Sequence, residues 1–270
     1  MVGNKPGRVQ AIIEHARRLI SRGFIGFRDA LSIRSKVSFA ESHIFGRVAA
    51  PLAHQLSRFT KEGGDSPISP ELRDTLSWTL DQIDVAAPKM VGPSSPVRPV
   101  LVFTDGACED AGVTVGAVAF FPEGDIEYFG MRMPEEIVQD WKSRIEQVQV
   151  IGQAELCPVA LARWTWAERL ANKRVIYMID NEAARLSLVK SYSPILQSLH
   201  LIQDCLQWDR GHSSIPWYAR VPSFSNVADD PSRMVHSPWL LSLKAVCVKP
   251  VLGRSFTSRH CFKLGSDCFL

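Results

Sequence analysis

The 270-residue sequence has few cysteines and no long apolar run. Its six cysteines are scattered without a CxxC pair, which predicts reduced thiols in an intracellular, cytoplasmic or nuclear protein rather than a disulfide framework. No run reaches about 18 apolar residues, so we expect no transmembrane helix and no membrane partner. The opening residues, MVGNKPGRVQAII, lack the apolar core of a secretory signal.

Three common functional motifs are missing as well: GxGxxG, the P-loop and the Ser-His-Asp pattern. Their absence argues against a dinucleotide-binding protein, a P-loop NTPase and a serine hydrolase. What is present is an ordinary composition, 46% hydrophobic and 22% charged, which is typical of a soluble globular protein.

Charge is distributed unevenly along the chain. Residues 1–62 hold 11 Lys/Arg and 4 Asp/Glu, a net charge of +7, so the remainder of this +3 chain carries −4. A basic first part beside an acidic second part suits a polyanion held next to a cation-dependent site. The alternative is that the arginine-rich helix faces are merely solvated.

The first part of the chain has helical periodicity. Residues 8–22 form one apolar stripe, and a second helical run covers 28–60, where Pro51 starts a new helix or bends the old one. Ser69 and Pro70 are typical of a helix N-cap followed by its first residue. The Pro-, Gly- and Ser-rich stretch 86–99 is the predicted linker.

The second part alternates between strand-like and helix-like segments. Three strands over 98–133 predict an antiparallel meander, and two later strands join them through helical crossovers. We expect one long helix over 153–171 and a last helix within 226–243. The expected fold class is therefore α/β, with a mixed five-stranded sheet flanked by helices and preceded by a small helical region. We expect domains at 1–97 and 98–241, and an extension of unknown structure at 242–270.

Four acidic residues stand at predicted strand ends or helix starts. They are Asp105, Glu155, Asp180 and Asp229. Open α/β sheets keep their sites at the carboxyl ends of strands. Carboxylates gathered there repel one another unless a divalent cation neutralises them, which favours a two-metal, Mg²⁺-dependent site. Taken singly, such an acid is more often a turn residue or a helix cap.

The motifs around these acids resemble those of the ribonuclease H superfamily, and most of all the ribonuclease H domains of gypsy-like and DIRS-like retroelement reverse transcriptases. The motifs are TDGA at 104–107, AEL at 154–156, DN at 180–181 after an apolar strand, and N-x-A-D-x-x-S-R at 226–233. The resemblance implies a ribonuclease H-like fold and makes the four acids both catalytic residues and metal ligands. Asp230 competes for the fourth role, and the family spacing favours Asp229.

Three further residues are implied in nucleic-acid binding. The amides of Gln153 and Asn181 flank catalytic positions, where they could contact the minor groove or 2′-hydroxyls of a hybrid. Arg233 contacts a phosphate or pairs with a nearby carboxylate. One departure from the family is Pro222-Ser223, which stands where many members carry a Gly-His loop, and this predicts a slower enzyme.

The stretch SIRSKVSFAESHIFGRVAAPLAHQLSRF, at 32–59, is similar to the helical thumb that precedes ribonuclease H in such reverse transcriptases. No Y-x-D-D polymerase motif follows or precedes it. The chain therefore looks like the C-terminal part of a polymerase polyprotein, or like the product of a gene derived from one, with a reverse transcriptase polymerase domain as the expected partner.

These observations predict an endonuclease that cuts the RNA strand of RNA–DNA hybrids with Mg²⁺, or Mn²⁺ as its substitute. A rival is a catalytically inactive ribonuclease H-fold module that binds nucleic acid or connects domains. A second rival is a DEDD-type 3′–5′ exonuclease, which the Gly106-Ala107 after Asp105 disfavours.

Overall fold

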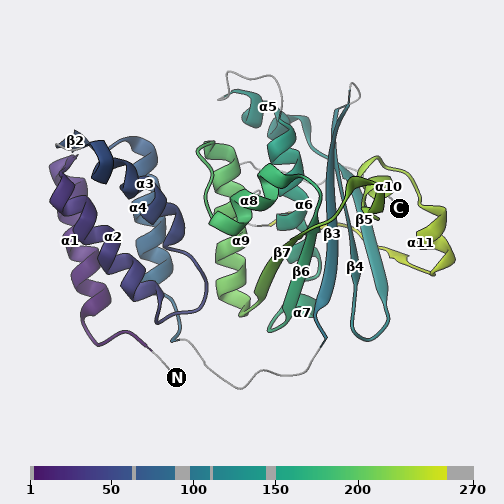
Figure 1. Cartoon of the computed structure of the whole chain (residues 1–270), viewed down its shortest axis with the longest axis horizontal. Helices are drawn as coiled ribbons and strands as arrows, with labels where there is room; N and C mark the ends of the chain where they lie inside the picture. Colours follow the sequence, from purple (N-terminus) through teal and green to yellow (C-terminus); the bar gives the residue numbers. More distant parts are fainter. Residues whose placement is uncertain (1–2, 63–64, 89–97, 110–111, 144–149, 254–270) are drawn as a thin grey trace. The chain divides into compact units, whose positions relative to one another are not determined.

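The computed structural model describes residues 3–62, 65–88, 98–109, 112–143 and 150–253 (Figure 1). The chain divides into two compact units, Met1–Ser95 and Pro96–Leu270. The division falls inside the linker predicted at 86–99, of which residues 89–97 lie outside the described part.

In the described part of the first unit the main elements are four helices. These are α1 (Arg8–Arg22), α2 (Phe27–Glu41), α3 (Ala50–Glu62) and α4 (Pro70–Asp84), with the short strands β1 (Phe24–Ile25) and β2 (Ser66–Pro67) paired between them. The run predicted at 28–60 is thus two helices, and Pro51 is the second residue of α3. Ser69 caps α4 by accepting a hydrogen bond from the Leu72 amide, as predicted.

The connection between α2 and α3 is held by Glu41, the last residue of α2. Its carboxylate accepts a hydrogen bond of 2.6 Å from the Ala49 amide, which satisfies one of the donors left over at the start of α3. Burial raises the pKa of Glu41, and the amides of Ala49 and Ala50 oppose that rise. The carboxylate therefore has a structural role in this turn.

The second unit is built on a mixed sheet. Its strands are β3 (Val100–Glu109), β4 (Gly112–Phe120), β5 (Ile126–Arg132), β6 (Arg174–Ile179), β7 (Ile215–Arg220) and β8 (Val246–Cys247). The order is β7-β6-β3-β4-β5-β8, with β3, β4 and β5 antiparallel and β6 and β7 added in parallel. The α/β class is confirmed, but the five-strand prediction missed β8, which pairs with β5 in parallel.

Helices cover both faces of this sheet. On one face α6 (Ile151–Thr165) packs on β3 and β4, with α9 (Leu196–His212) beside it. On the other face α10 (Asp229–Ser232) contacts β3, β4 and β5. The remaining described helices are α5 (Glu135–Ser143), α7 (Ala167–Leu170), α8 (Glu182–Lys190), η1 (Ser223–Ser225) and α11 (Pro238–Ser242). Figure 1 shows α6, α8 and α9 on one side of the strands and α10 and α11 on the other.

Three predicted elements differ in their bounds. Strand β3 continues past Asp105 to Glu109, because it stays paired with β4 beyond the end of β6. The long helix predicted after residue 151 is interrupted at Trp166, and the last helix is the two short helices α10 and α11. Of the predicted extension 242–270, residues 254–270 lie outside the described part.

A buried ion pair joins α6 to α9. Arg163 is fully buried, donates to both carboxylate oxygens of Asp209 at 2.9 and 3.0 Å and to the Tyr218 hydroxyl at 2.9 Å, and lies over the Tyr177 ring. Such a pair adds little net stability over apolar residues of the same size, but losing one partner costs about 3–5 kcal/mol. It therefore links α6, the helix that carries Glu155, to α9 and to Tyr218 on β7.

Two further findings concern the described residues only. None of their helices is both long and apolar enough to cross a membrane. Four of the six cysteines fall among them, at positions 108, 157, 205 and 247, and all four are free thiols.

Candidate active site

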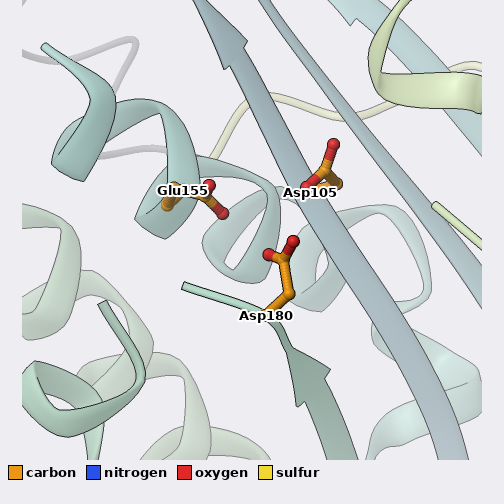
Figure 2. A group of neighbouring side chains, drawn as sticks. All are labelled: Asp105, Glu155 and Asp180. Carbon is orange, nitrogen blue, oxygen red and sulfur yellow. The ribbon is translucent and has the colours of Figure 1, made fainter. Parts of the chain in front are cut away.

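Three of the four predicted acids converge. One carboxylate oxygen each of Asp105, Glu155 and Asp180 lies within 4.8 Å of the other two. Figure 2 shows the three side chains reaching one common space from β3, α6 and the end of β6. Asp105 and Glu155 are buried, and Asp180 is half-buried.

The parallel pairing of β3 with β6 brings the two aspartates together. The last paired residues are Thr104 and Ile179, and an aspartate follows each of them. Because parallel strands point their carboxyl ends the same way, both side chains emerge at the same level of the sheet. The predicted neighbourhood of Asp105 and Asp180 is therefore correct, although Asp105 lies within a strand and not at its end.

Glu155 reaches the aspartates because α6 lies very close to β3. A methyl group at Gly106 would come within 2.3 Å of the Ala154 carbonyl oxygen, so only glycine permits this approach. Pro158, four residues after Ala154, has no amide proton, so it cannot donate the usual helical hydrogen bond to the Ala154 carbonyl. On the strand side, the Gly106 amide donates a hydrogen bond to the Glu155 carboxylate.

Asp105 is held from the other side by the N-x-A-D-x-x-S-R segment. The Ser232 hydroxyl donates to one of its carboxylate oxygens. The Asn226 amide donates to the other at 3.4 Å and to the Thr104 carbonyl at 3.1 Å. Asn226 and Ser232 both belong to the motif found in the sequence. Their hydrogen bonds to Asp105, more than a hundred residues away in the chain, could not be predicted from that motif.

A second glycine makes this contact possible. Gly116 on β4 stands opposite Asp105 in the antiparallel ladder, and a methyl group there would come within 2.3 Å of the Ser232 amide nitrogen. Because neighbouring residues of a strand face opposite sides, Asp105 and Gly116 face α10, and Gly106 faces α6. The two glycines seat the two helices on opposite faces.

The electrostatics of the site oppose full ionisation. Burial raises the pKa of Asp105 to about 6, repulsion by Asp180 and Asp229 adds to the rise, and the hydrogen bond from Ser232 opposes it. Burial, together with the charges of Asp105 and Asp180, raises the pKa of Glu155 to about 9. Carboxylates so placed gain strongly from a nearby positive charge.

Two carboxylate oxygens of the cluster also lack a partner. Within the part of the chain that the structure describes, Glu155 Oε2 and Asp180 Oδ1 are buried without a hydrogen bond. A buried acceptor left unpaired is costly, and hard divalent cations prefer oxygen ligands of this kind. The cluster is therefore compatible with divalent metal binding.

The fourth acid is placed differently. Asp229 is the first residue of α10 and is half-exposed, and its carboxylate accepts a hydrogen bond of 3.1 Å from Arg233 Nε. Arg233 also pairs with Glu109 at 2.7 Å. Of the two roles predicted for Arg233, these contacts favour pairing with carboxylates. Asp229 is near enough for its charge to act on Asp105, but it is outside the three-residue cluster.

Of the two amides predicted to bind nucleic acid, Asn181 lies at the cluster and Gln153 is buried on the helix that carries Glu155. The Asn181 side-chain oxygen caps α8 by accepting from the Ala184 amide at 3.0 Å, and the side chain also hydrogen-bonds Glu155. Gln153 is 1% exposed, and its Nε2 has no acceptor among the described residues. A role for either amide in binding a hybrid stays a prediction.

Comparison with known proteins gives likenesses of structure alone. No family model matches the chain, and no curated protein matches it. Among solved structures, RNase H1 from the archaeon Halobacterium salinarum is similar over 50% of this chain and 94% of its own, with 16% identity and a TM-score of 0.40. LC9-RNase H1 is similar over 61% of this chain and 93% of its own, with 15% identity and a TM-score of 0.36.

A third similar structure is the N-terminal RNase H domain of a Mycobacterium tuberculosis protein, as a fusion with maltose-binding protein. It covers 50% of this chain and 91% of its own, with 14% identity and a TM-score of 0.33. Scores this low do not indicate function. The fold class predicted from the sequence, a ribonuclease H-like mixed sheet flanked by helices, agrees with the strand order in this chain.

Proposed function

We propose that this chain is a divalent-metal-dependent endonuclease of the ribonuclease H type, which cuts the RNA strand of RNA–DNA hybrids. The observation that carries the proposal is the cluster of Asp105, Glu155 and Asp180, three carboxylates within 4.8 Å of one another. Two of their buried oxygens have no hydrogen-bond partner among the described residues. Mg²⁺, or Mn²⁺ in its place, is the cation proposed for them.

Each residue has a role that follows from its position. Asp105 and Asp180 would hold the cation between two parallel strands, and Glu155 would close the site from α6. Asn226 and Ser232 keep the Asp105 carboxylate in one orientation. A cation bound there would help to activate water and to neutralise charge on the leaving oxygen of a phosphodiester.

The choice of hybrid as substrate, and the origin in a gypsy-like or DIRS-like retroelement, rest on the motifs at 104–107, 154–156, 180–181 and 226–233. The basic first unit would bind the phosphate backbone of the duplex. A reverse transcriptase polymerase domain is the proposed partner, because the chain contains no polymerase motif of its own.

The test uses a hybrid whose RNA strand is labelled at one end, incubated with Mg²⁺ or Mn²⁺. We expect internal cuts in the RNA strand and none in the matching single-stranded RNA or all-DNA duplex. The Asp105→Asn/Asp180→Asn double variant should be inactive, and the exposed Asp81→Asn on α4 serves as the matched control. If the wild-type chain cleaves no more than the double variant, the proposal is wrong. Trimming from the strand end, without internal cuts, would favour an exonuclease.

A second candidate is an inactive ribonuclease H-fold module that binds nucleic acid. It is favoured by the position of Asp229, whose carboxylate is paired with Arg233 outside the cluster. Thermal unfolding separates the two candidates when cleavage is absent. If Mg²⁺ leaves the melting temperature of the wild-type chain unchanged while a hybrid still binds, the module is the better description.

A further inference from the structure

A cavity of about 310 Å³ lies beside the acidic cluster. It is formed by the turn that follows β7 and by α10 and α11, and it shares two residues with the candidate active site. These are Asn226, which holds Asp105, and Asp229. A strand bound at the carboxylates would therefore have neighbouring nucleotides within reach of this cavity.

Two exposed aromatic residues line the cavity. Phe224 in η1 is 93% exposed, and Trp239 in α11 is 48% exposed. Trp239 packs on Phe120 of the sheet, with ring centroids 6.3 Å apart, which steadies its position. Full burial of a phenylalanine side chain stabilises a protein by about 1.5–3 kcal/mol. The exposed Phe224 side chain contributes little of this stabilisation in the free protein.

The charge of the lining residues favours the nucleobase of a nucleotide over its phosphate group. Asp229, which is paired with Arg233, and Asp230 both line the cavity, and none of the described residues that line it is basic. The cavity therefore does not attract a phosphate group, whereas the face of a nucleobase is uncharged. Three serines, Ser223, Ser225 and Ser237, also line the cavity. Aromatic side chains stack on any base, with a gain of about 1–3 kcal/mol for each base.

We propose that this cavity, which we call the Phe224 cavity, binds one unpaired nucleobase of a strand that extends beyond the hybrid. A base inside a duplex presents only its edges to the grooves, so a base from within the hybrid could not stack on Phe224. The inference rests on the proposed function, because it places the base next to the carboxylates that would cut the hybrid. It adds a preference for hybrids with a single-stranded extension.

The test compares two hybrids that differ only in their unpaired RNA extension. One extension carries nucleobases, and the other is abasic with the same sugars and phosphates, so the charges are equal. We expect the abasic extension to raise KM for hybrid cleavage about fivefold or more, because it offers no base to stack on Phe224. Phe224→Ala should make the two hybrids equal, and Phe224→Trp should restore the difference.

Folding does not obscure this result, because the Phe224 side chain is almost fully exposed. Trp217→Ala is the matched control, since Trp217 is a 70% exposed aromatic residue on β7 that does not line the cavity. Equal KM values for the two hybrids in the wild-type chain overturn the inference. So does a Phe224→Ala variant that keeps the preference, or one that changes only the self-association of the chain in sedimentation.

Failure of the proposed function is distinguishable from failure of the inference. Fluorescence anisotropy with short single strands, one bearing bases and one abasic, needs neither cleavage nor a metal. If the chain cuts no hybrid but binds the base-bearing strand more tightly through Phe224, the base site stands and the nuclease does not. If it shows no preference there either, both fail.

Discussion

At the scale of single residues, the site depends on partners that neutralise or orient carboxylates. Asp105 is the centre of this arrangement. It accepts hydrogen bonds from Ser232 and Asn226, and the negative charges of Asp180 and Asp229 repel its own. The hydrogen bond from Ser232 lowers the pKa of Asp105, against the larger effect of burial. In the proposed nuclease, Ser232 would thus act through Asp105, as a positioning residue.

Ser232→Ala should weaken metal binding and cleavage by about 10–100-fold, as is common for residues that orient metal ligands. Without the hydrogen bond, the pKa of Asp105 rises further above 6. Since Asp105 must lose its proton to bind a cation, the acid limb of the pH–rate profile moves to higher pH. The Mg²⁺ concentration for half-maximal cleavage, measured across pH, checks this.

The exposed Ser242 hydroxyl, which donates to the Trp239 carbonyl, provides the control. Ser242→Ala should leave the profile in place. If Ser232→Ala lowered the rate equally at every pH and Mg²⁺ concentration, its hydroxyl would not act through the proton of Asp105.

At the scale of elements, two glycines decide how closely the helices approach the sheet. Gly106 admits α6 and Gly116 admits α10, each at a point where a methyl group would meet backbone at 2.3 Å. Backbone cannot move aside as a flexible side chain can. A shift of either helix displaces Glu155 or Ser232 from Asp105, so element packing and site geometry are coupled.

Gly106→Ala should destabilise the chain by about 1–3 kcal/mol, the usual cost of overpacking, and should reduce cleavage more than stability alone explains. Gly152→Ala within α6 is the matched control, because a methyl group there meets nothing within 4 Å. Urea unfolding and cleavage rates measure the two effects. A folded Gly106→Ala variant with a normal rate would contradict the coupling of α6 packing to Glu155.

At the scale of the whole molecule, charge is divided unevenly between the first 62 residues and the rest of the chain. The first 62 residues carry +7 and the remainder −4, and the exposed arginines of α2 include Arg28 and Arg34. If these residues bind phosphates, they supply affinity while the acidic cluster supplies chemistry. If they are only solvated, the charge of the first unit has no bearing on substrate.

Arg28→Ala/Arg34→Ala should weaken hybrid binding and reduce the slope of log affinity against log salt by about one for each phosphate that the variant no longer neutralises. The control is Arg73→Ala. Arg73 is an exposed arginine on α4, so this variant also loses one positive charge for each residue replaced. Binding titrations at several salt concentrations give the slopes. Unchanged slopes in the double variant would favour the solvated-face interpretation.

Much of the element order could be predicted from local patterns. The periodicity of apolar residues indicated the meander and the crossover strands, and Ser69-Pro70 marked the start of α4. The bounds that were wrong depended on distant contacts. β3 runs past Asp105 because β4 pairs with it, and β8 forms only because β5 offers an edge to a two-residue segment.

The sequence by itself determined which four acids to consider and that two of them follow apolar strands, because capping, periodicity and motif spacing are local properties. Only the tertiary structure decided that Asp105, Glu155 and Asp180 meet while Asp229 stays outside their cluster. It alone joined Ser232 to Asp105 and Phe224 to Trp239 around one cavity. Such contacts depend on how closely helices pack on the sheet, and no short-range pattern encodes that distance.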